Sequence, residues 1–482
     1  MASKMLGFVH LGREMPVKRP AAGRRRDFRE IYPRYDVDQA GKQAGRCSQC
    51  GVPFCQVHCP VHNNIPDWLK LAAEGRLEEA YEVSSATNNF PEICGRICPQ
   101  DRLCEGNCVI EQAGHGTVTI GAIERFITDT AWEKGWVKPA KPRRELDRSV
   151  GIIGAGPAGL SAAEELRRRG YRVTVYDRHD RVGGLMIYGI PNFKLEKEVV
   201  LRRAGLLAEA GVRFQLKTEI GRDLSFAELR RNHDALLIAC GVYKAREMQA
   251  PGSGLPGILP ALDYLTASNR SSLGDEVPGL RNGSLSAKGK HVVVIGGGDT
   301  AMDCVRTAVR QGARSVKCLY RRDRANMPGS QREVAYAEEE GVEFVFLAQP
   351  EAFLGEGRVS GLLAQRIHLG LADATGRQAP QPIEASRFRL EADLAIKALG
   401  FDPEDVPALF GAPELAVTRW GTVKIDHRTM MTSLDGVFAA GDIVRGASLV
   451  VWAIRDGRDA AAGIDRHLTA KRQARFVPAA AE

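Results

Sequence analysis

The sequence predicts an α/β protein built around two dinucleotide-binding units, with a mainly helical domain in front of them. From Val150 onward, short β-branched runs alternate with glycine turns and amphipathic helices, which is typical of parallel α/β sheets. That pattern starts twice, at residue 150 and again at residue 291. The N-terminal part differs, because eight of the eleven cysteines fall between Cys47 and Cys108.

Length and composition limit the class of protein. A chain of 482 residues is too long for one hydrophobic core, so two or three domains are expected. The 44% hydrophobic and 26% charged residues are typical of a soluble globular protein. No run of ~18 apolar residues predicts a membrane helix, and no secretory segment opens the chain. We therefore expect no membrane association and a reducing, cytoplasmic location, where clustered cysteines hold metal more often than they form disulfides.

The net charge of +8 is concentrated near the N-terminus. Residues 1–46 hold eleven Lys and Arg against five Asp and Glu. Nothing aromatic or repetitive accompanies this basic arm, so no nucleic-acid partner is expected. We interpret the arm as a solvated segment or as a tail that docks on a protein partner.

The helical domain is expected to span residues 1–145. In the stretch 65–88, apolar residues recur at helical spacing, and Pro66 stands near the helix start, where proline is tolerated. The proline-bearing segment 138–149 then predicts a linker.

The first glycine-rich turn follows a short buried strand. Gly154 permits the tight turn, Gly156 lets the backbone approach a pyrophosphate, and Gly159 lets the next helix pack closely on the strand. The helix start presents unpaired N–H groups to phosphates. A second strand ends at Asp177, where a carboxylate accepts from ribose hydroxyls. The binding residues expected in this unit are Gly154, Gly156, Pro157, Ala158, Gly159 and Asp177.

The second glycine-rich turn has the same pattern but the opposite charge at the ribose position. Gly296, Gly298 and Ala301 occupy the three small-residue positions of the turn. The following strand ends at Tyr320, and arginines stand where the first unit has an acid. Guanidinium groups bind a 2′-phosphate that a carboxylate would repel. The expected residues of this unit are Gly296, Gly298, Asp299, Thr300, Ala301, Arg321 and Arg322.

Opposite charges at the two ribose positions indicate FAD in the first unit and NADPH in the second. A C-terminal strand, expected at 437–440, ends in Gly441 and Asp442. This segment resembles the second flavin motif of FAD/NAD(P)-linked reductases, in which the Asp contacts the ribityl chain. The FAD domain is then discontinuous. The expected domains are 1–145 (helical), 146–285 with 418–482 (FAD) and 286–417 (NADPH).

The cysteines of the N-terminal domain form two runs, C-x2-C-x4-C-x3-C-P from Cys47 and C-x3-C-x5-C-x3-C from Cys94. Three close cysteines and a fourth before proline are typical of ferredoxin runs, in which the fourth serves a second cluster. Structural zinc is the alternative, but only Cys47 and Cys50 have its usual paired spacing. Two 4Fe–4S clusters need about eight ligands. The candidates are Cys47, Cys50, Cys55, Cys59, Cys94, Cys98, Cys104 and Cys108.

Several motifs carry a resemblance over nearly the whole chain. They include QAGRCSQCGVPFCQVHCPVHNNIPDW, ICGRICPQDRLCEGNC, IIGAGPAGL, GGLMIYGIPNFKLEK and VVVIGGGDTAMDC. With these motifs the chain resembles the small (β) subunit family of bacterial NADPH-dependent glutamate synthases. It is also similar to the electron-input half of dihydropyrimidine dehydrogenase. The resemblance implies one cluster on Cys47, Cys50, Cys55 and Cys108, and another on Cys59, Cys98 and Cys104.

The eighth cluster ligand stays open between two residues. Counting favours Cys94, whereas the resembling dehydrogenase uses a glutamine at the position of Glu124, which we favour slightly. A carboxylate oxygen is a poorer ligand for cluster iron than a thiolate, but it would tune the potential. The resemblance further implies that Gly184 and Leu185 contact FAD.

The resemblance implies an electron-input subunit of a hetero-oligomer. NADPH reduces FAD, and electrons leave through two 4Fe–4S clusters to a large, FMN-containing subunit that makes glutamate from glutamine and 2-oxoglutarate. The alternative is the NADPH-handling subunit of a bifurcating ferredoxin:NADP oxidoreductase or of a pyrimidine reductase. A disulfide reductase is disfavoured, because Cys240, Cys304 and Cys318 form no CxxC pair. A zinc-bearing nucleic-acid module is disfavoured by the intact glycine turns, and no catalytic side chain is predicted.

Overall fold

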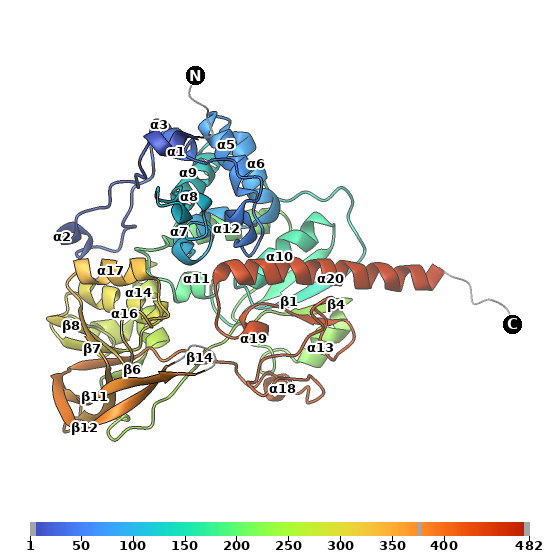
Figure 1. The fold of residues 1–482 in the computed structure, drawn as a ribbon. Coiled ribbons are helices and arrows are strands. Elements are labelled where there is room, and N and C mark those ends of the chain that lie inside the picture. The colour runs from blue at the N-terminus through green and yellow to red at the C-terminus, as the bar shows by residue number, and fades with distance from the viewer. Residues whose placement is uncertain (1–5, 374–377, 477–482) are drawn as a thin grey trace.

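A computed structural model of the chain describes residues 6–373 and 378–476. Figure 1 shows a helical N-terminal unit above two α/β units that lie side by side. Each α/β unit contains a five-stranded parallel sheet. The long helix α20 (Val450–Phe476) packs on α10 (Pro157–Arg168) of the first α/β unit. The expected combination of two α/β units and a helical N-terminal unit is confirmed.

The N-terminal unit is helical, and its core contains the fully buried side chains of Trp68 and Ile123. Helices α7 (Pro91–Ile97) and α9 (Ile120–Glu133) cross at two glycines. A Cβ on Gly95 would lie 2.8 Å from the carbonyl oxygen of Gly121. This close crossing brings the cysteines around α7 next to Glu124 on α9. The helices are α1 (Gly7–His10), α2 (Ala21–Arg24), α3 (Val37–Ala44), α4 (Phe54–Val57), α5 (Ile65–Ala73), α6 (Leu77–Thr87), α7 (Pro91–Ile97), η2 (Gln100–Arg102), α8 (Val109–Gln112) and α9 (Ile120–Glu133).

The first α/β unit has the strand order β15–β4–β1–β2–β3. Its central strands are apolar and buried because parallel sheets are covered on both faces. Val437 of β15 pairs with Leu236 of β4, so the C-terminal segment completes this sheet. The elements are β1 (Ser149–Ile153), α10 (Pro157–Arg168), β2 (Arg172–Tyr176), α11 (Leu185–Tyr188), α12 (Lys197–Glu209), β3 (Arg213–Gln215), α13 (Phe226–Asn232), β4 (Ala235–Ile238), α18 (Val406–Leu409), β15 (Val437–Ala439) and α19 (Asp442–Arg445).

The second α/β unit has the strand order β6–β13–β7–β8–β9 and carries an antiparallel sheet, β10–β11–β12. Val292 and Val294 of β7 lie in its main core. The elements are β6 (Ile258–Pro260), α14 (Ala261–Ser272), α15 (Pro278–Arg281), β7 (His291–Ile295), α16 (Asp299–Arg310), β8 (Ser315–Tyr320), α17 (Gln331–Glu339), β9 (Glu343–Phe346), β10 (Ala348–Leu354), β11 (Gly361–Ala372), β12 (Gln378–Glu391) and β13 (Leu394–Lys397).

The chain crosses between the two α/β units at a two-stranded antiparallel pair, β5 (Lys244–Ala245) with β14 (Phe401–Asp402). Ile258 of β6 pairs with Ala395 of β13, which places β6 in the second unit. Val406 packs in a core of the first unit. We therefore propose that both domain boundaries lie at this crossing, rather than at 285/286 and 417/418 as expected from the sequence. Residues 477–482 of the expected FAD domain lie outside the described residues.

The basic arm packs on the second α/β unit. Arg24 of α2 is fully buried, and its Nε lies 3.0 Å from Oε1 of Glu340, which is also fully buried. Lys18 Nζ lies 2.6 Å from Oε1 of Glu339 and 4.4 Å from the ring centre of Tyr336. The interpretation as a solvated or partner-docking segment is wrong for this part of the arm, because Lys18 and Arg24 pair with acids of the same chain. These acids stand more than 300 residues later in the sequence, so the local pattern did not indicate them.

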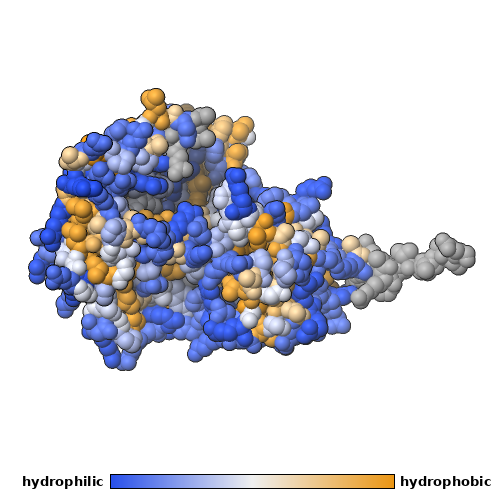
Figure 2. All heavy atoms as spheres, turned by 90° about the horizontal axis from the view of Figure 1, so that it is seen from below, coloured by the Kyte–Doolittle hydropathy of each residue, from blue (hydrophilic) through white to orange (hydrophobic). Residues whose placement is uncertain are grey.

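The surface differs between the units. Within the described residues, no helix is long and apolar enough to cross a membrane. Figure 2 shows the lower face as mostly hydrophilic, with apolar residues in small groups. Exposed apolar side chains gather instead around the first cysteine run, where Val52, Phe54, Val57 and Val109 are 39–63% exposed.

Candidate functional site

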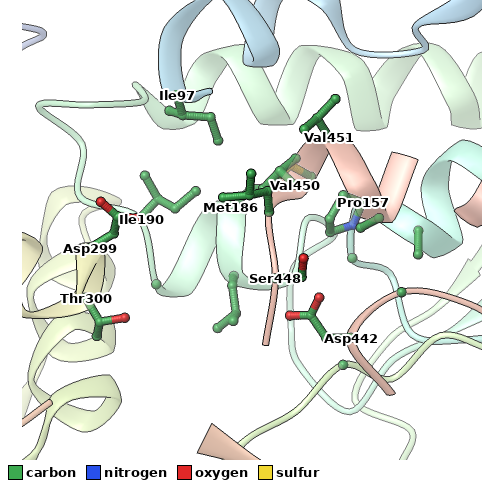
Figure 3. A pocket seen from close by; sticks show the side chains of 18 of the residues that line it. Ile97, Pro157, Met186, Ile190, Asp299, Thr300, Asp442, Ser448, Val450 and Val451 are labelled. Carbon is green, nitrogen blue, oxygen red and sulfur yellow. The ribbon is translucent and has the colours of Figure 1, made fainter. Parts of the chain in front are cut away.

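A cavity of about 260 Å³ lies where the three units meet. Figure 3 shows Asp442, Ser448 and Pro157 on the side of the first unit. Asp299 and Thr300, at the start of α16, lie on the opposite side of the same view. This central cavity therefore joins the two nucleotide sites that the sequence predicts.

The first glycine turn has the geometry that a dinucleotide requires. Gly154 has a φ of +111°, and a Cβ there would lie 2.3 Å from the carbonyl oxygen of Ala239. A Cβ on Gly159 would lie 2.0 Å from the carbonyl oxygen of Gly154, so the helix packs directly on the turn. In contrast, nothing lies within 4 Å of a Cβ on Gly156, which leaves open space at the start of α10. Open space before the unpaired N–H groups of a helix start is the arrangement that suits a phosphate.

The acid at the end of β2 is held firmly in place. The Oδ2 atom of Asp177 accepts from the backbone N–H of Ala155 at 2.7 Å, and Oδ1 accepts from the N–H of His179 at 2.8 Å. Asp177 also lines the central cavity. Its carboxylate is thus fixed beside the turn, where ribose hydroxyls would lie.

Two glycine contacts close the cavity around the first turn. A Cβ on Gly184 would lie 2.9 Å from the Cα of Gly156, and a Cβ on Gly441 would lie 2.9 Å from the Cβ of Ala158. Asp442 follows at the start of α19, and burial raises the pKa of its carboxyl to about 7. A carboxyl with that pKa both donates to and accepts from hydroxyls near neutral pH. Leu185 lines the same cavity.

The second glycine turn repeats this geometry. Gly296 has a φ of +144°, and a Cβ there would lie 2.2 Å from the carbonyl oxygen of Ala398. Nothing lies within 4 Å of a Cβ on Gly298, which is the N-cap of α16. Ala301 is fully buried, as its position in the fingerprint requires. The open space at Gly298 and the helix start suit a second pyrophosphate.

The two arginines after β8 lie where the fingerprint places the ribose. Arg321 is exposed and Arg322 is half-buried. The buried Nε of Arg322 has no hydrogen-bond partner in the structure, so a donor is free for a phosphate. The next arginine in the segment, Arg324, is already paired with Glu338 at 2.5 Å.

Four cysteines surround a small cavity of about 20 Å³ near the surface, the outer cavity. No three described His, Cys, Asp or Glu side chains converge as they would on one metal ion. Burial raises the pKa of Cys47 to about 11 and that of Cys55 to about 12. These thiols lose their protons when a metal centre compensates the thiolate charge. The four cysteines are Cys47, Cys50, Cys55 and Cys108.

The other four cysteines line a second cavity of about 30 Å³, the inner cavity. Burial raises the pKa of Cys59 to about 12 and that of Cys104 well above its usual value. The division of the cysteines between the cavities agrees with the two ligand sets that the resemblance implies. The residues of the inner cavity with ligand chemistry are Cys59, Cys94, Cys98, Cys104 and Glu124.

Both candidates for the eighth ligand face the inner cavity and share one neighbour. The Sγ of Cys94 donates to Oδ1 of Asn88 at 3.7 Å, and Nδ2 of Asn88 donates to Oε1 of Glu124 at 3.3 Å. Burial raises the pKa of Glu124 to about 8. Glu124 is therefore not a surface residue, and it forms no ion pair with Arg125, which pairs with Glu30 instead.

The central cavity also contains charged residues that sequence reasoning missed. Nζ of Lys194 lies 2.9 Å from Oδ1 of Asp303 and 3.7 Å from Oε2 of Glu333, and the two carboxylates raise its pKa. Asp303 lies four residues after Asp299, so both share one face of α16. That spacing is the signal that would have found Asp303. Arg332 of α17 had no local signal, because its hydrogen-bond acceptor, the carbonyl oxygen of Cys98, belongs to the N-terminal unit.

Comparisons with known protein families agree with this arrangement. Residues 24–136 match a family described as dihydropyrimidine dehydrogenase domain II, 4Fe–4S cluster. Residues 148–457 match the pyridine nucleotide-disulphide oxidoreductases. Fold and site thus define the class: a flavin- and nicotinamide-nucleotide-dependent oxidoreductase with an N-terminal 4Fe–4S domain.

Individual relatives narrow this class. The chain is 71% identical over 477 residues to the glutamate synthase (NADPH) small chain of Azospirillum brasilense, with 99% of both chains covered. It is 45% identical over 474 residues to the corresponding chain of Escherichia coli (strain K12), with 96% of this chain and 99% of that one covered. The chain belongs to the family of NADPH-dependent glutamate synthase small chains, as the motifs predicted. It is an NADPH-dependent oxidoreductase whose cofactors are FAD, NADPH and 4Fe–4S clusters.

Solved structures show the fold of the two α/β units. FprA from Mycobacterium tuberculosis in complex with NADPH matches with a TM-score of 0.56 at 20% identity, covering 69% of this chain and 86% of that chain. Thioredoxin reductase from Lactococcus lactis matches with a TM-score of 0.50 at 20% identity, covering 67% and 100%.

Proposed function

We propose that the chain takes electrons from NADPH in the central cavity and passes them through the outer face of its N-terminal unit to a large subunit of glutamate synthase. Bound FAD accepts a two-electron hydride and yields electrons singly, and 4Fe–4S clusters carry one electron each. One observation carries the proposal. Cys94 and Cys98 line both the central cavity and the inner cavity, so the flavin site and a cluster site share a wall.

The order of the sites follows from the residues that they share. The inner cavity adjoins the central cavity at Cys94 and Cys98, and it adjoins the outer cavity at Ile120. Exposed side chains flank the outer cavity, since Phe54 lines it and Val52 lies nearby in the chain, and these are 48% and 63% exposed. We therefore propose that electrons enter at the second glycine turn and leave at the outer cavity.

The chain's own residues bind and orient the cofactors. We propose that the unpaired N–H groups at the starts of α10 and α16 hold the two pyrophosphates. Asp177 and Asp442 then orient the hydroxyls of FAD, whereas Arg321 and Arg322 bind the 2′-phosphate of NADPH. The remaining proposed cofactor contacts are Gly154, Gly156, Pro157, Ala158, Gly159, Gly184, Leu185 and Gly441 for FAD, and Gly296, Gly298, Asp299, Thr300 and Ala301 for NADPH.

Membership of the family implies a large-subunit partner. We propose that this subunit carries FMN, forms glutamate from glutamine and 2-oxoglutarate, and docks at the outer cavity. The support is the group of exposed apolar side chains there, because such groups on a soluble protein mark interaction sites. The residues are Val52, Phe54, Val57 and Val109.

The isolated chain tests the division of labour between the subunits. We expect it to oxidise NADPH with artificial electron acceptors and to form no glutamate from glutamine and 2-oxoglutarate. The measurement is NADPH absorbance with each acceptor, together with glutamate analysis of the reaction mixture. Glutamate formation by the pure chain would show that the proposed need for a large subunit is wrong.

A second experiment identifies the eighth ligand of the inner cavity. Cys94→Ala and Glu124→Ala are prepared separately, and iron and acid-labile sulfide are counted in each protein. If Glu124 is the ligand, its loss damages one cluster, whereas Cys94→Ala keeps both. The reverse result assigns the ligand to Cys94. Glu133→Ala, at the exposed end of the same helix α9, is the matched control and should keep both clusters.

A further inference from the structure

A row of polar contacts joins the second glycine turn to the loop between Cys98 and Cys104, the cysteine loop. We call this row the seam, and its side chains are those of Asp101, Arg102, Asp299, Ser330 and Arg332. Arg102, in this loop, donates from Nη1 to the carbonyl oxygen of Pro328 at 2.7 Å. Its Nη2 lies 3.4 Å from Oδ2 of Asp299, the first residue of α16. One guanidinium thus contacts both the segment before α17 and the helix start that faces the nucleotide phosphates.

The seam continues through the residues before α17. The backbone N–H of Ser330 donates to Oδ1 of Asp299 at 2.9 Å, and its hydroxyl donates to Oδ1 of Asp101 at 3.3 Å. The N–H of Gly329 donates to the carbonyl oxygen of Gly297, inside the glycine turn, at 3.1 Å. If nucleotide binding moves the glycine turn, the movement therefore reaches the backbone of residues 328–330. This is the same backbone that contacts the loop between Cys98 and Cys104.

Arg332 completes the seam. Its Nη2 donates to the carbonyl oxygen of Cys98 at 3.4 Å, and its side chain lines the central cavity. Two arginines of the neighbouring helix α16 differ, because Arg306 and Arg310 are paired with the buried carboxylate of Glu340. Among the described residues, Arg332 has no carboxylate within ion-pair distance. Its cation is therefore directed at the cavity and at the cysteine loop.

We propose that this seam couples nucleotide binding at the second glycine turn to the reduction potential of the cluster held by Cys98 and Cys104, with Arg332 as the positioning residue that transmits the effect. The proposal rests on the cluster ligands proposed above. A cation beside the backbone of a cluster ligand stabilises the reduced, more negative cluster and so raises its potential. Nucleotide phosphates enter the cavity that Arg332 lines, and they change the field that its guanidinium presents to the cluster.

Coupling of this kind is reciprocal. If the nucleotide changes the potential of the cluster, reduction of the cluster changes the affinity for the nucleotide by the same factor. Through the seam, the affinity for the oxidised nucleotide would thus differ between the reduced and the oxidised state of the cluster held by Cys98 and Cys104. The rate of nucleotide release would then depend on the redox state of that cluster.

The test uses the full chain loaded with FAD and clusters, and adenosine 2′,5′-bisphosphate as the probe. This probe carries phosphates of NADP⁺ without the nicotinamide, so it exchanges no hydride. In redox titrations followed by electron paramagnetic resonance, we expect the probe to shift the midpoint potential of one cluster and to leave the other unchanged. The Kd of the probe should differ about fivefold or more between oxidised and reduced protein.

Variants connect the effect to the seam. Arg332→Gln should lower the midpoint of that cluster without the probe and abolish the probe-dependent shift, whereas Arg332→Lys should keep much of both. Arg324→Gln, which changes an exposed arginine paired with Glu338, is the control and should behave as the unchanged chain. If Arg332→Gln loses iron, Arg102→Gln replaces it, because Arg102 lies on the more exposed side of the seam.

Two outcomes overturn the proposal. In one, the probe leaves both midpoints of the unchanged chain where they were, or the shift survives in the variants. In the other, Cys98→Ala keeps its full iron and sulfide. That second result refutes the cluster ligands on which the proposal rests, and iron analysis alone distinguishes it from the first.

Discussion

Replacing Arg321 and Arg322 together by alanine is expected to raise the KM for NADPH by at least tenfold and to leave the KM for NADH nearly unchanged. Each charge-assisted hydrogen bond to a phosphate contributes roughly 1.5–3 kcal/mol. Loss of two such contacts, roughly 3–6 kcal/mol together, therefore reaches about a hundredfold or more if both act fully. Only the 2′-phosphate distinguishes the two nucleotides, so the loss appears with NADPH alone.

The measurement is steady-state reduction of an artificial acceptor with each nucleotide. Arg324→Ala is the control, because Arg324 stands in the same segment but is paired with Glu338. It should leave both KM values near those of the unchanged chain. Equal changes for NADPH and NADH in the double variant would mean that Arg321 and Arg322 do not bind the 2′-phosphate.

Replacing Glu92 by alanine is expected to lower the free energy of unfolding by about 3–5 kcal/mol. Glu92 of α7 is fully buried and accepts two hydrogen bonds from Arg203 of α12, at 2.8 and 2.9 Å. The pair joins the N-terminal unit to the first α/β unit. Its loss leaves a buried guanidinium without a counter-charge, which is costly because the ion is far from water.

Urea denaturation followed by circular dichroism measures this effect. Glu414→Ala is the control, because Glu414 forms an exposed pair with Arg230 at 3.8 Å and should cost less than about 1 kcal/mol. The double variant Glu92→Leu with Arg203→Met should recover much of the loss, since a well-packed apolar pair avoids the desolvation cost. A single variant as stable as the unchanged chain would contradict the predicted role of the pair.

The parts of the site that depend on short-range sterics were predictable from the sequence. Gly154 and Gly296 must be glycine because backbone oxygens lie within 2.3 Å of any Cβ placed there, and that requirement is visible in the spacing of the turn. The buried side of helix α9, which carries Glu124, was also predictable from the sequence. Ile123 and Ile127 are spaced as on one face of a helix, and both are fully buried in the structure.

The parts that depend on long-range contacts were not predictable from residues alone. The short strand β6 shows no alternation of apolar and polar residues, so the pattern did not reveal that it pairs with β13. Arg24 stands in a run of arginines that resembles a solvated segment, and its pairs with the distant Glu339 and Glu340 explain its burial. The role proposed for Arg332 depends on its hydrogen bond to the carbonyl oxygen of Cys98, and Cys98 belongs to the N-terminal unit.

The docking of the basic arm on α17 also sets an order in the synthesis of the chain. Arg24 pairs with Glu339, which is 315 residues farther along. At a translation rate of about 5–20 residues per second, the arm waits for roughly 15–60 s before its partners leave the ribosome. The arm, which is made well before α17, is therefore buried only after α17 has been made. Closure of the arm over the second α/β unit is a late step of folding, after the cysteine-rich unit has left the ribosome.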